Sequence, residues 1–283
     1  MTAVHLPAER VPTEIPEIRD ADGILHKPAE YKRIVPLSPN LTEICIALGL
    51  KDHLAGASVY GDQPEIVKVP KIDGWKVNYE TILLLKPDLV LTTSAGNTQQ
   101  VVKRLRALGL NVFHTKQENI PAIYDTILTI GDITSSRKNA DIIVYRMKRE
   151  LEEIRSGFSG NRRMPRVLYL IWASPVMAVG EDNFLSEMIS ISGGRNIFEG
   201  SGLKIIRPSL EKIIDLDPEI IFLPEGTKPS ELDKRWKVIT AVKNGRVFNV
   251  NENLVLRPGI NTIRGIRELS QLIHPKDPEE RKK

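Results

Sequence analysis

The chain contains the stretch NYETILLLKPDLVL at residues 78–91 and a related stretch, SLEKIIDLDPEIIF, at residues 209–222. Glu80 aligns with Glu211 and Pro87 with Pro218, at one constant spacing. Each copy predicts a short helix, a proline that ends it and an apolar strand. Proline cannot continue a helix and disfavours helical geometry in the residue before it, so we expect that residue to be extended. Strands that are apolar throughout suit a parallel sheet buried on both faces. The repeat therefore predicts two similar α/β lobes.

The sequence around both copies alternates between strand and helix patterns, which is typical of a parallel, doubly wound sheet. We expect Asn40 to cap the helix that ends near Gly49. The expected strands are 33–37, 54–58, 111–114, 166–172, 176–179 and 246–250, and the expected helices are 98–108, 120–130, 184–192 and 258–273.

Residues 135–156 contain no glycine or proline, and Ile143, Met147, Leu151 and Ile154 recur at helical spacing. A helix of this length runs about 30 Å. We expect an α/β fold of two Rossmann-like lobes with central parallel sheets, joined by one long α-helix that allows little relative motion. The predicted organisation is an N-terminal arm 1–32 with a hairpin turn at 20–23, an N-terminal lobe 33–134, a linking helix 135–158, a C-terminal lobe 159–275 and a tail 276–283.

Composition excludes several classes of protein. The 283 residues are 41% hydrophobic and 27% charged, which indicates a globular chain. The net charge of +4 is spread along the sequence, so we expect no nucleic-acid partner. Cys45 is the only cysteine, which excludes an intrachain disulfide. No run approaches the roughly 18 apolar residues of a membrane span, and no leader pattern is visible. The chain is therefore either cytoplasmic or a mature form of an exported protein.

Motifs that carry chemistry are also missing from the sequence. The five histidines are scattered, and neither a phosphate loop, a dinucleotide fingerprint nor a nucleophile elbow occurs. We expect no catalytic residue, no bound metal and no intrinsic cofactor, although a mechanism that uses carboxylates alone stays open.

A binding cleft is the remaining site, because ligands of open α/β sheets bind beyond the carboxyl ends of the strands. Trp75, in a glycine-containing loop, and Trp172 offer flat faces for a large apolar ligand. Trp172 could equally be strand-end core. Arg257 could bind a carboxylate or phosphate, or form a surface salt bridge. The residues predicted from these loops to bind ligand are Ser38, Pro39, Asn40, Tyr60, Trp75, Asn97, Trp172, Asn253 and Arg257.

Glu80 and Glu211 occupy the same position in the two repeat copies. A glutamate on a helix is ordinarily a solvated surface residue. Two carboxylates at matching places are, however, what a two-fold symmetric basic partner requires. We therefore predict that these residues dock a partner.

The sequence resembles the substrate-binding proteins of ABC importers for ferric siderophores, haem and cobalamin, whose lobes are joined by a backbone helix. The resemblance covers about residues 33–274. It rests on RIVPLSPNLTE at 33–43, on the two repeat copies, on GGRNIF at 193–198 and on LRPG at 256–259. It implies ligand capture between the lobes without covalent chemistry. It also implies that Glu80 and Glu211 meet arginines on the two copies of a membrane permease, which this protein contacts as a monomer.

Within that cluster, IDGWKVNYE at 72–80 is similar to cobalamin binders, which hold the corrinoid against a tryptophan at this place. The segment YGDQP at 60–64 fits a family loop that lines the pocket. The chain departs from the best-known cobalamin binder in the second lobe. There Met177, Ile205 and Leu254 hold positions that are aromatic in that protein, and PGIN at 258–261 replaces the usual Pro-Gly-Pro-Arg. Met177 is accordingly a further candidate ligand residue.

Several ligands and locations stay open from the sequence. The bound ligand is expected to be cobalamin or a related corrinoid. The alternatives are haem, held by Tyr60 or Tyr79, and a ferric siderophore, held by Arg257, Arg207 and Tyr60. The resemblance implies a periplasmic or cell-surface location. A cytoplasmic enzyme or corrinoid-handling protein on the same scaffold is the alternative from another class.

Overall fold

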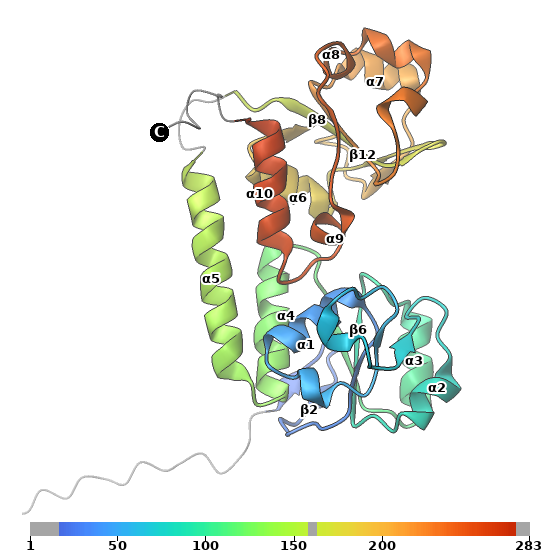
Figure 1. Cartoon of the computed structure of the whole chain (residues 1–283), viewed down its shortest axis with the longest axis vertical. Coiled ribbons are helices and arrows are strands. Elements are labelled where there is room, and N and C mark those ends of the chain that lie inside the picture. The colour runs from blue at the N-terminus through green and yellow to red at the C-terminus, as the bar shows by residue number, and fades with distance from the viewer. Residues whose placement is uncertain (1–16, 158–162, 276–283) are drawn as a thin grey trace, which may run out of the picture.

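Two α/β lobes lie one above the other beside a long helix in the computed structural model of the chain, which describes residues 17–157 and 163–275 (Figure 1). Predictions for residues 1–16, 158–162 and 276–283 lie outside the described part. In the N-terminal lobe, strands β3 (Ile34–Pro36), β6 (Leu89–Thr93) and β7 (Val112–Thr115) form a parallel sheet in the order β3-β6-β7. A second parallel pair, β4 (Ala57–Ser58) and β5 (Lys71–Ile72), adjoins it through a bridge between Ile34 and Leu54.

The C-terminal lobe has a mixed sheet whose centre is parallel. β8 (Arg166–Ala173), β12 (Ile220–Leu223), β13 (Val247–Asn249) and β10 (Arg195–Asn196) run parallel, whereas β9 (Val176–Val179) and β11 (Ile205–Ile206) add an antiparallel edge. The predicted α/β class with parallel sheets is confirmed. The remaining helices of the lobes are α1 (Pro39–Ala47), α3 (Gln99–Ala107), α6 (Phe184–Ile191), α8 (Thr240–Lys243), α9 (Glu252–Val255) and the 3₁₀ segments η1 (Lys51–His53), η2 (Pro64–Ile66), η3 (Pro229–Glu231) and η4 (Lys234–Val238).

The repeat seen in the sequence forms the same structure twice. The Asn78 side chain caps helix α2 (Tyr79–Leu84), and the aligned Ser209 caps α7 (Leu210–Leu216). Each cap oxygen accepts a hydrogen bond from the backbone N–H three residues on, which satisfies a helix N–H that has no intrahelical partner. Each helix is followed by a fully buried strand, β6 or β12.

One prediction about the repeat is wrong. The residue before each proline is left-handed rather than extended, with φ of 47° at Lys86 and 41° at Asp217. A left-handed residue also avoids the right-handed helical region that proline disfavours. In addition, its N–H can donate a hydrogen bond to a carbonyl near the end of the helix, as the Asp217 N–H does to the Ile213 carbonyl.

A matching arginine at the start of each lobe fastens the repeat to the sheet. The Arg33 guanidinium donates to the carbonyls of Leu85 and Lys86, and Arg166 donates to those of Leu216 and Asp217. The backbone N–H groups of the same two arginines donate to the carboxylates of Asp88 and Glu219, at 3.0 Å in both lobes. Each lobe therefore ties its repeat helix to the first strand of its sheet with the same bonds.

Replacing Arg166 by alanine should lower the free energy of unfolding by about 1–2 kcal/mol, because it leaves two helix-terminal carbonyls without a charged donor. Urea denaturation followed by circular dichroism measures the change. Arg195→Ala is the matched control, because the Arg195 side chain is 60% exposed and, within the described part of the chain, makes only a 4.0 Å ion pair with Glu199. An equal loss in both variants would contradict a fastening role for Arg166.

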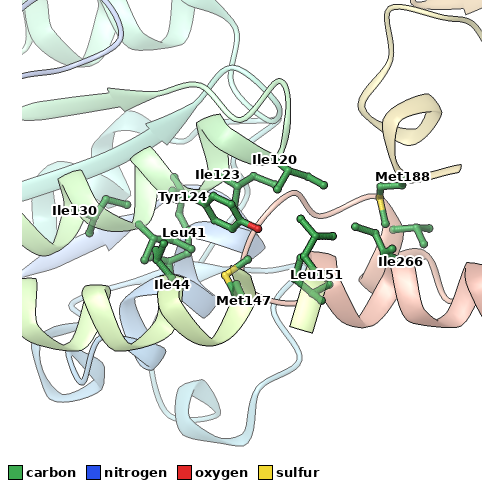
Figure 2. Close-up of a cluster of buried hydrophobic side chains, with 14 of the residues drawn as sticks. Leu41, Ile44, Ile120, Ile123, Tyr124, Ile130, Met147, Leu151, Met188 and Ile266 are labelled. Carbon is green, nitrogen blue, oxygen red and sulfur yellow. The ribbon is translucent and has the colours of Figure 1, made fainter. Parts of the chain in front are cut away.

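The two lobes share one apolar core. Helix α5 (Arg137–Ser156) packs against α4 (Ile120–Ile133) beside the N-terminal lobe and against α10 (Thr262–Ile273) beside the C-terminal lobe. Figure 2 shows Leu41, Tyr124 and Met147 at one end of this core and Met188 and Ile266 at the other. Because the cluster is continuous, relative motion of the lobes would disturb close packing. The rigidity between the lobes therefore depends on the packing of α4, α5 and α10 and not on α5 alone.

Two predicted helix starts are wrong. Ser38, not Asn40, is the N-cap of α1, and the Asn40 amide in the first turn instead donates to the Pro258 carbonyl at 2.8 Å. The last helix begins at Thr262 and not at Pro258. The segment between them forms a turn in which the Gly259 N–H bonds to the Thr262 hydroxyl. The Pro258 carbonyl thus accepts a hydrogen bond from the other lobe instead of one within a helix.

The described part of the predicted N-terminal arm packs on the N-terminal lobe. β1 (Ile18–Arg19) and β2 (Leu25–His26) form an antiparallel hairpin, which confirms the predicted turn at 20–23. Arg106 on α3 donates to Asp20 at 2.5 Å and to Asp22 at 2.7 Å. No helix among residues 17–157 and 163–275 is long and apolar enough to cross a membrane.

Candidate ligand site between the lobes

Loops from both lobes enclose a cavity of about 370 Å³. Seven of the ten predicted ligand residues line it, together with six residues that the prediction did not name. The predicted ones are Ser38, Pro39, Asn40, Tyr60, Trp75, Asn253 and Arg257, and the additional ones are Leu37, Ala95, Gly96, Glu252, Leu256 and Pro258. The carboxyl ends of β3, β6 and β13 lead into these loops, as expected for an open α/β sheet.

The backbone of the loop that carries Trp75 is held in place by Asp73, by close packing at Gly74 and by Asn97. The Asp73 carboxylate accepts the backbone N–H groups of Trp75 and Lys76 at 2.8 and 3.0 Å, and these bonds hold the pKa of Asp73 below its ordinary value. A Cβ on Gly74 would lie 1.9 Å from the Leu37 carbonyl oxygen, so only glycine permits this close approach. The Trp75 side chain is nevertheless 65% exposed. The site therefore presents a large aromatic face on a backbone that cannot readily move.

Asn97 supports this loop instead of lining the cavity. Its side chain is buried, its Nδ2 donates to the Gly74 carbonyl at 2.9 Å and its Oδ1 accepts from the Thr93 N–H at 3.1 Å. Both amide groups are thus engaged by the protein, and Asn97 acts on the site through the position of Trp75.

Arg257 links the two lobes at the floor of the cavity. Its guanidinium donates to Glu43 at 3.2 Å, to Asp62 at 3.3 Å and to the Tyr60 carbonyl at 2.8 Å. Asn253 also donates to Asp62, at 3.3 Å. The salt-bridge alternative for Arg257 is therefore present, and two carboxylates neutralise its charge.

Glu43 is buried in helix α1 beneath this network. Besides Arg257, it accepts hydrogen bonds from Asn261 at 3.0 Å and from Gln63 at 3.2 Å. Burial raises the pKa of its carboxyl, and the hydrogen bonds from Asn261 and Arg257 offset only part of that effect. Glu43 is the one charged residue of α1, and this was the signal in the sequence that could have indicated the contact.

The raised pKa of Glu43 predicts a pH dependence. A folded-state pKa above the unfolded value contributes stability that is complete below the unfolded pKa and is lost as pH rises through the folded pKa. Compared with Glu43→Gln, which does not titrate, the wild type should therefore lose unfolding free energy as the pH is raised above the ordinary glutamate pKa of about 4. Urea denaturation of both proteins across this range measures the difference. A difference that grows in favour of the wild type as pH rises would contradict the assignment.

Trp172 and Met177 do not line the 370 Å³ cavity. They lie opposite each other on the β8–β9 hairpin of the C-terminal lobe. Trp172 is 58% exposed, and its Nε1 donates to the Ser174 carbonyl at 2.8 Å. The strand-end core alternative for Trp172 is therefore wrong, since its ring faces solvent.

A larger hollow of about 900 Å³ adjoins the first, and Ala95 lines both. Ser94, Gln117 and Glu118 line it from the N-terminal lobe, and residues 181–184, 186, 187 and Lys204 from the C-terminal lobe. Glu187 on α6 accepts the Ile120 N–H at 3.0 Å, which joins the lobes beside the hollow. The space between the lobes thus extends beyond the cavity next to Trp75.

Residues 17–157 and 163–275 contain no group of three or more His, Cys, Asp or Glu side chains that could hold a metal ion. Cys45 is a free, fully buried thiol, and burial raises its pKa to about 12. It therefore stays protonated and unreactive.

Glu80 and Glu211 lie away from the cavity, at the second position of α2 and of α7. These helices lie at the lower and upper ends of the molecule, on the side away from α5 (Figure 1). Both side chains are exposed. The backbone N–H of Glu211 and the Ser209 hydroxyl hold the pKa of Glu211 below its ordinary value, so its carboxylate is charged at neutral pH.

Comparisons with known proteins place the chain in a family. A model of the family described as periplasmic binding protein (Peripla_BP_2) matches residues 34–254. An uncharacterised ABC transporter substrate-binding lipoprotein of Bacillus subtilis is 32% identical over 94% of this chain and 87% of its own. The crystal structure of a periplasmic vitamin B12-binding protein of Vibrio cholerae has a TM-score of 0.77 and 27% identity, and covers 86% of this chain and 97% of its own. A possible iron-binding, periplasmic solute-binding protein of Staphylococcus epidermidis has a TM-score of 0.78 and 28% identity over 87% of this chain and 100% of its own.

The chain therefore belongs to the periplasmic binding protein family. It is an ABC transporter substrate-binding protein of the group that includes vitamin B12, haem and siderophore binders, and not an enzyme. Such proteins bind a small molecule and deliver it to a permease. The relatives are periplasmic proteins or lipoproteins, which supports an extracytoplasmic location.

Proposed function

We propose that this protein captures cobalamin or a related corrinoid between its lobes and delivers it to an ABC permease that it contacts, as a monomer, through Glu80 and Glu211. The observation that carries the choice of ligand is Trp75, which is 65% exposed at the edge of the inter-lobe cavity on a loop fixed by Asp73, Gly74 and Asn97. A rigid, exposed aromatic face suits a large, flat, partly apolar ligand.

The size of the site supports a ligand that spans both hollows. A cavity of 370 Å³ lies at the small end of the roughly 300–1,000 Å³ typical of ligand sites. The adjoining 900 Å³ hollow shares Ala95 with it and is lined mainly by polar side chains. A corrinoid has a flat ring with amide-bearing arms. Its ring would rest on Trp75, and its amides would find hydrogen-bond partners in the second hollow.

The charge of the site favours a corrinoid over haem, whose propionates are anionic. Glu43 and Asp62 already engage Arg257, so this side of the cavity offers little net positive charge to a haem propionate. The amides of a corrinoid require no such charge. In the C-terminal lobe, Met177 is not aromatic. Trp172 lies opposite it on the β8–β9 hairpin, however, and exposes an aromatic ring.

Calorimetric titration of the purified protein with cyanocobalamin, haem and a ferric hydroxamate siderophore tests the proposal. We expect cyanocobalamin to bind with a Kd below about 10 μM and the other two to bind more weakly. If haem or the siderophore binds more tightly than cyanocobalamin, that molecule is the ligand and the corrinoid is not. If none of the three binds below about 10 μM, the proposal fails.

A further inference from the structure

The two corners of the molecule that carry Glu80 and Glu211 differ in chemistry, although they share a fold. In the aligned helices, Thr81 of α2 corresponds to Lys212 of α7, and Leu84 corresponds to Asp215. Leu83 corresponds to Ile214, which packs against the C-terminal core. Beside the glutamate that the two repeat copies share, the helix therefore carries a leucine in the N-terminal lobe and an aspartate in the C-terminal lobe.

The N-terminal corner exposes apolar surface beside a free carboxylate. Leu84 is 80% exposed and Leu83 is 39% exposed. Among the described residues, the Glu80 carboxylate has no hydrogen-bond or ion-pair partner. A groove of about 630 Å³ runs between α2 and α3 and is lined by Val77, Asn78, Tyr79, Glu80, Leu83, Arg104 and Leu108. Two exposed leucines on one short helix indicate a contact surface, because exposed apolar patches often mark sites of protein interaction.

In the C-terminal corner, helix α7 exposes no large apolar side chain, and the nearest exposed one is Val238 on η4, which is 52% exposed. Arg235 on η4 lies 3.7 Å from the Glu211 carboxylate and also pairs with Asp233 at 3.0 Å. Glu211 is therefore partly neutralised within its own lobe, and its neighbours Lys212 and Asp215 are exposed and charged. Because the Arg235 and Glu211 side chains are 65% and 72% exposed, salt and a competing partner can displace their contact.

We propose that the N-terminal corner holds an apolar docking contact that the C-terminal corner lacks, so that the protein meets the two halves of its permease unequally. This inference rests on the proposed delivery to a permease. The partner is a permease surface that presents a basic side chain to Glu80 and an apolar side chain to Leu83, Leu84 and the adjacent groove. The charge of Glu80 fits the basic group because no described residue satisfies it. At the other corner the exposed side chains of α7 are all charged, and docking through Glu211 must first displace Arg235.

The test measures docking of full-length protein to the cognate permease–ATPase complex in lipid nanodiscs, by biolayer interferometry at about 0.1 M and about 1 M salt. Leu84→Ser removes the apolar side chain without adding charge, and we expect it to weaken docking about 3- to 10-fold at both salt concentrations. Leu84→Asp copies the other corner and should weaken docking more than 10-fold. Asp215→Ser is the matched control and should stay within about 2-fold of the wild type.

Each outcome decides the inference. Leu84 is exposed, so its variants should fold, and a corrinoid titration with unchanged affinity verifies this. If Leu84→Ser docks like the wild type, or if Asp215→Ser weakens docking equally, the inference is overturned while the proposed function stands. If the wild type fails to dock, the delivery function and this inference fall together. If docking is normal but no corrinoid binds, only the proposed ligand falls.

Discussion

Replacing Glu80 and Glu211 together by alanine is expected to reduce ligand uptake more than about 100-fold while ligand affinity stays at the wild-type value. Both carboxylates are exposed at the first turns of α2 and α7, and neither residue lines the inter-lobe cavity. Each loss removes a charged contact with the permease, and a desolvated charge pair at an interface is worth about 2–5 kcal/mol when one partner is truncated. Their effect on folding should be small, because both side chains are exposed and the loss is confined to an interaction with the helix dipole.

Uptake in cells that lack the wild-type protein, together with calorimetry on the purified variant, separates the two effects. Glu65→Ala is a suitable control, since Glu65 is an exposed acid of the N-terminal lobe outside both repeat helices. Weakened ligand binding in the double variant would place the acids in the pocket and contradict the docking assignment. Of the single variants, Glu80→Ala should lose more uptake than Glu211→Ala, because Arg235 already pairs with Glu211.

Trp75→Ala is expected to weaken corrinoid binding by about 1–3 kcal/mol, which corresponds to roughly 5- to 150-fold in Kd. The side chain provides the large aromatic face at the edge of the cavity, and its backbone is held before the ligand arrives. Binding therefore requires little further ordering of the loop, so most of the contact energy contributes to affinity. Calorimetric titration with cyanocobalamin measures the change.

Two further variants sharpen the test of Trp75. Tyr145→Ala removes an aromatic ring of similar exposure from α5, outside the site, and should leave affinity unchanged. Trp75→Phe keeps an aromatic face and should recover most of the affinity. An unchanged Kd for Trp75→Ala would remove this residue from the binding site and with it the main support for a corrinoid.

Much of the fold was predictable because its determinants are local. A proline after a short apolar helix, followed by an unbroken run of aliphatic residues, specifies helix, stop and buried strand from neighbouring residues alone. Residues 78–91 and 209–222 show this pattern, and in the structure they form α2–β6 and α7–β12 with the same caps. The long helix at 137–156 was predictable for the same reason, since its apolar spacing is continuous.

Three of the errors occur where a distant group replaces a local partner. Pro258 is well suited to the first turn of a helix, but its carbonyl accepts a bond from Asn40 in the other lobe, and the helix starts at Thr262. Asn40 for the same reason does not cap its own helix. Asn97, expected in the pocket, supports Gly74 instead. None of these contacts has a signal in the sequence, because each joins segments that meet only after folding.

The amino-acid sequence alone was sufficient for the family, for the two-lobed α/β architecture and for the loops that surround the cleft, because helix, strand and turn preferences act between neighbours and the duplication made them visible twice. Three-dimensional packing was needed to learn that Arg257 is neutralised by Glu43 and Asp62, that the lobes share one core, and that the corners bearing Glu80 and Glu211 differ in surface chemistry. Burial and pairing of charges depend on which segments meet in space.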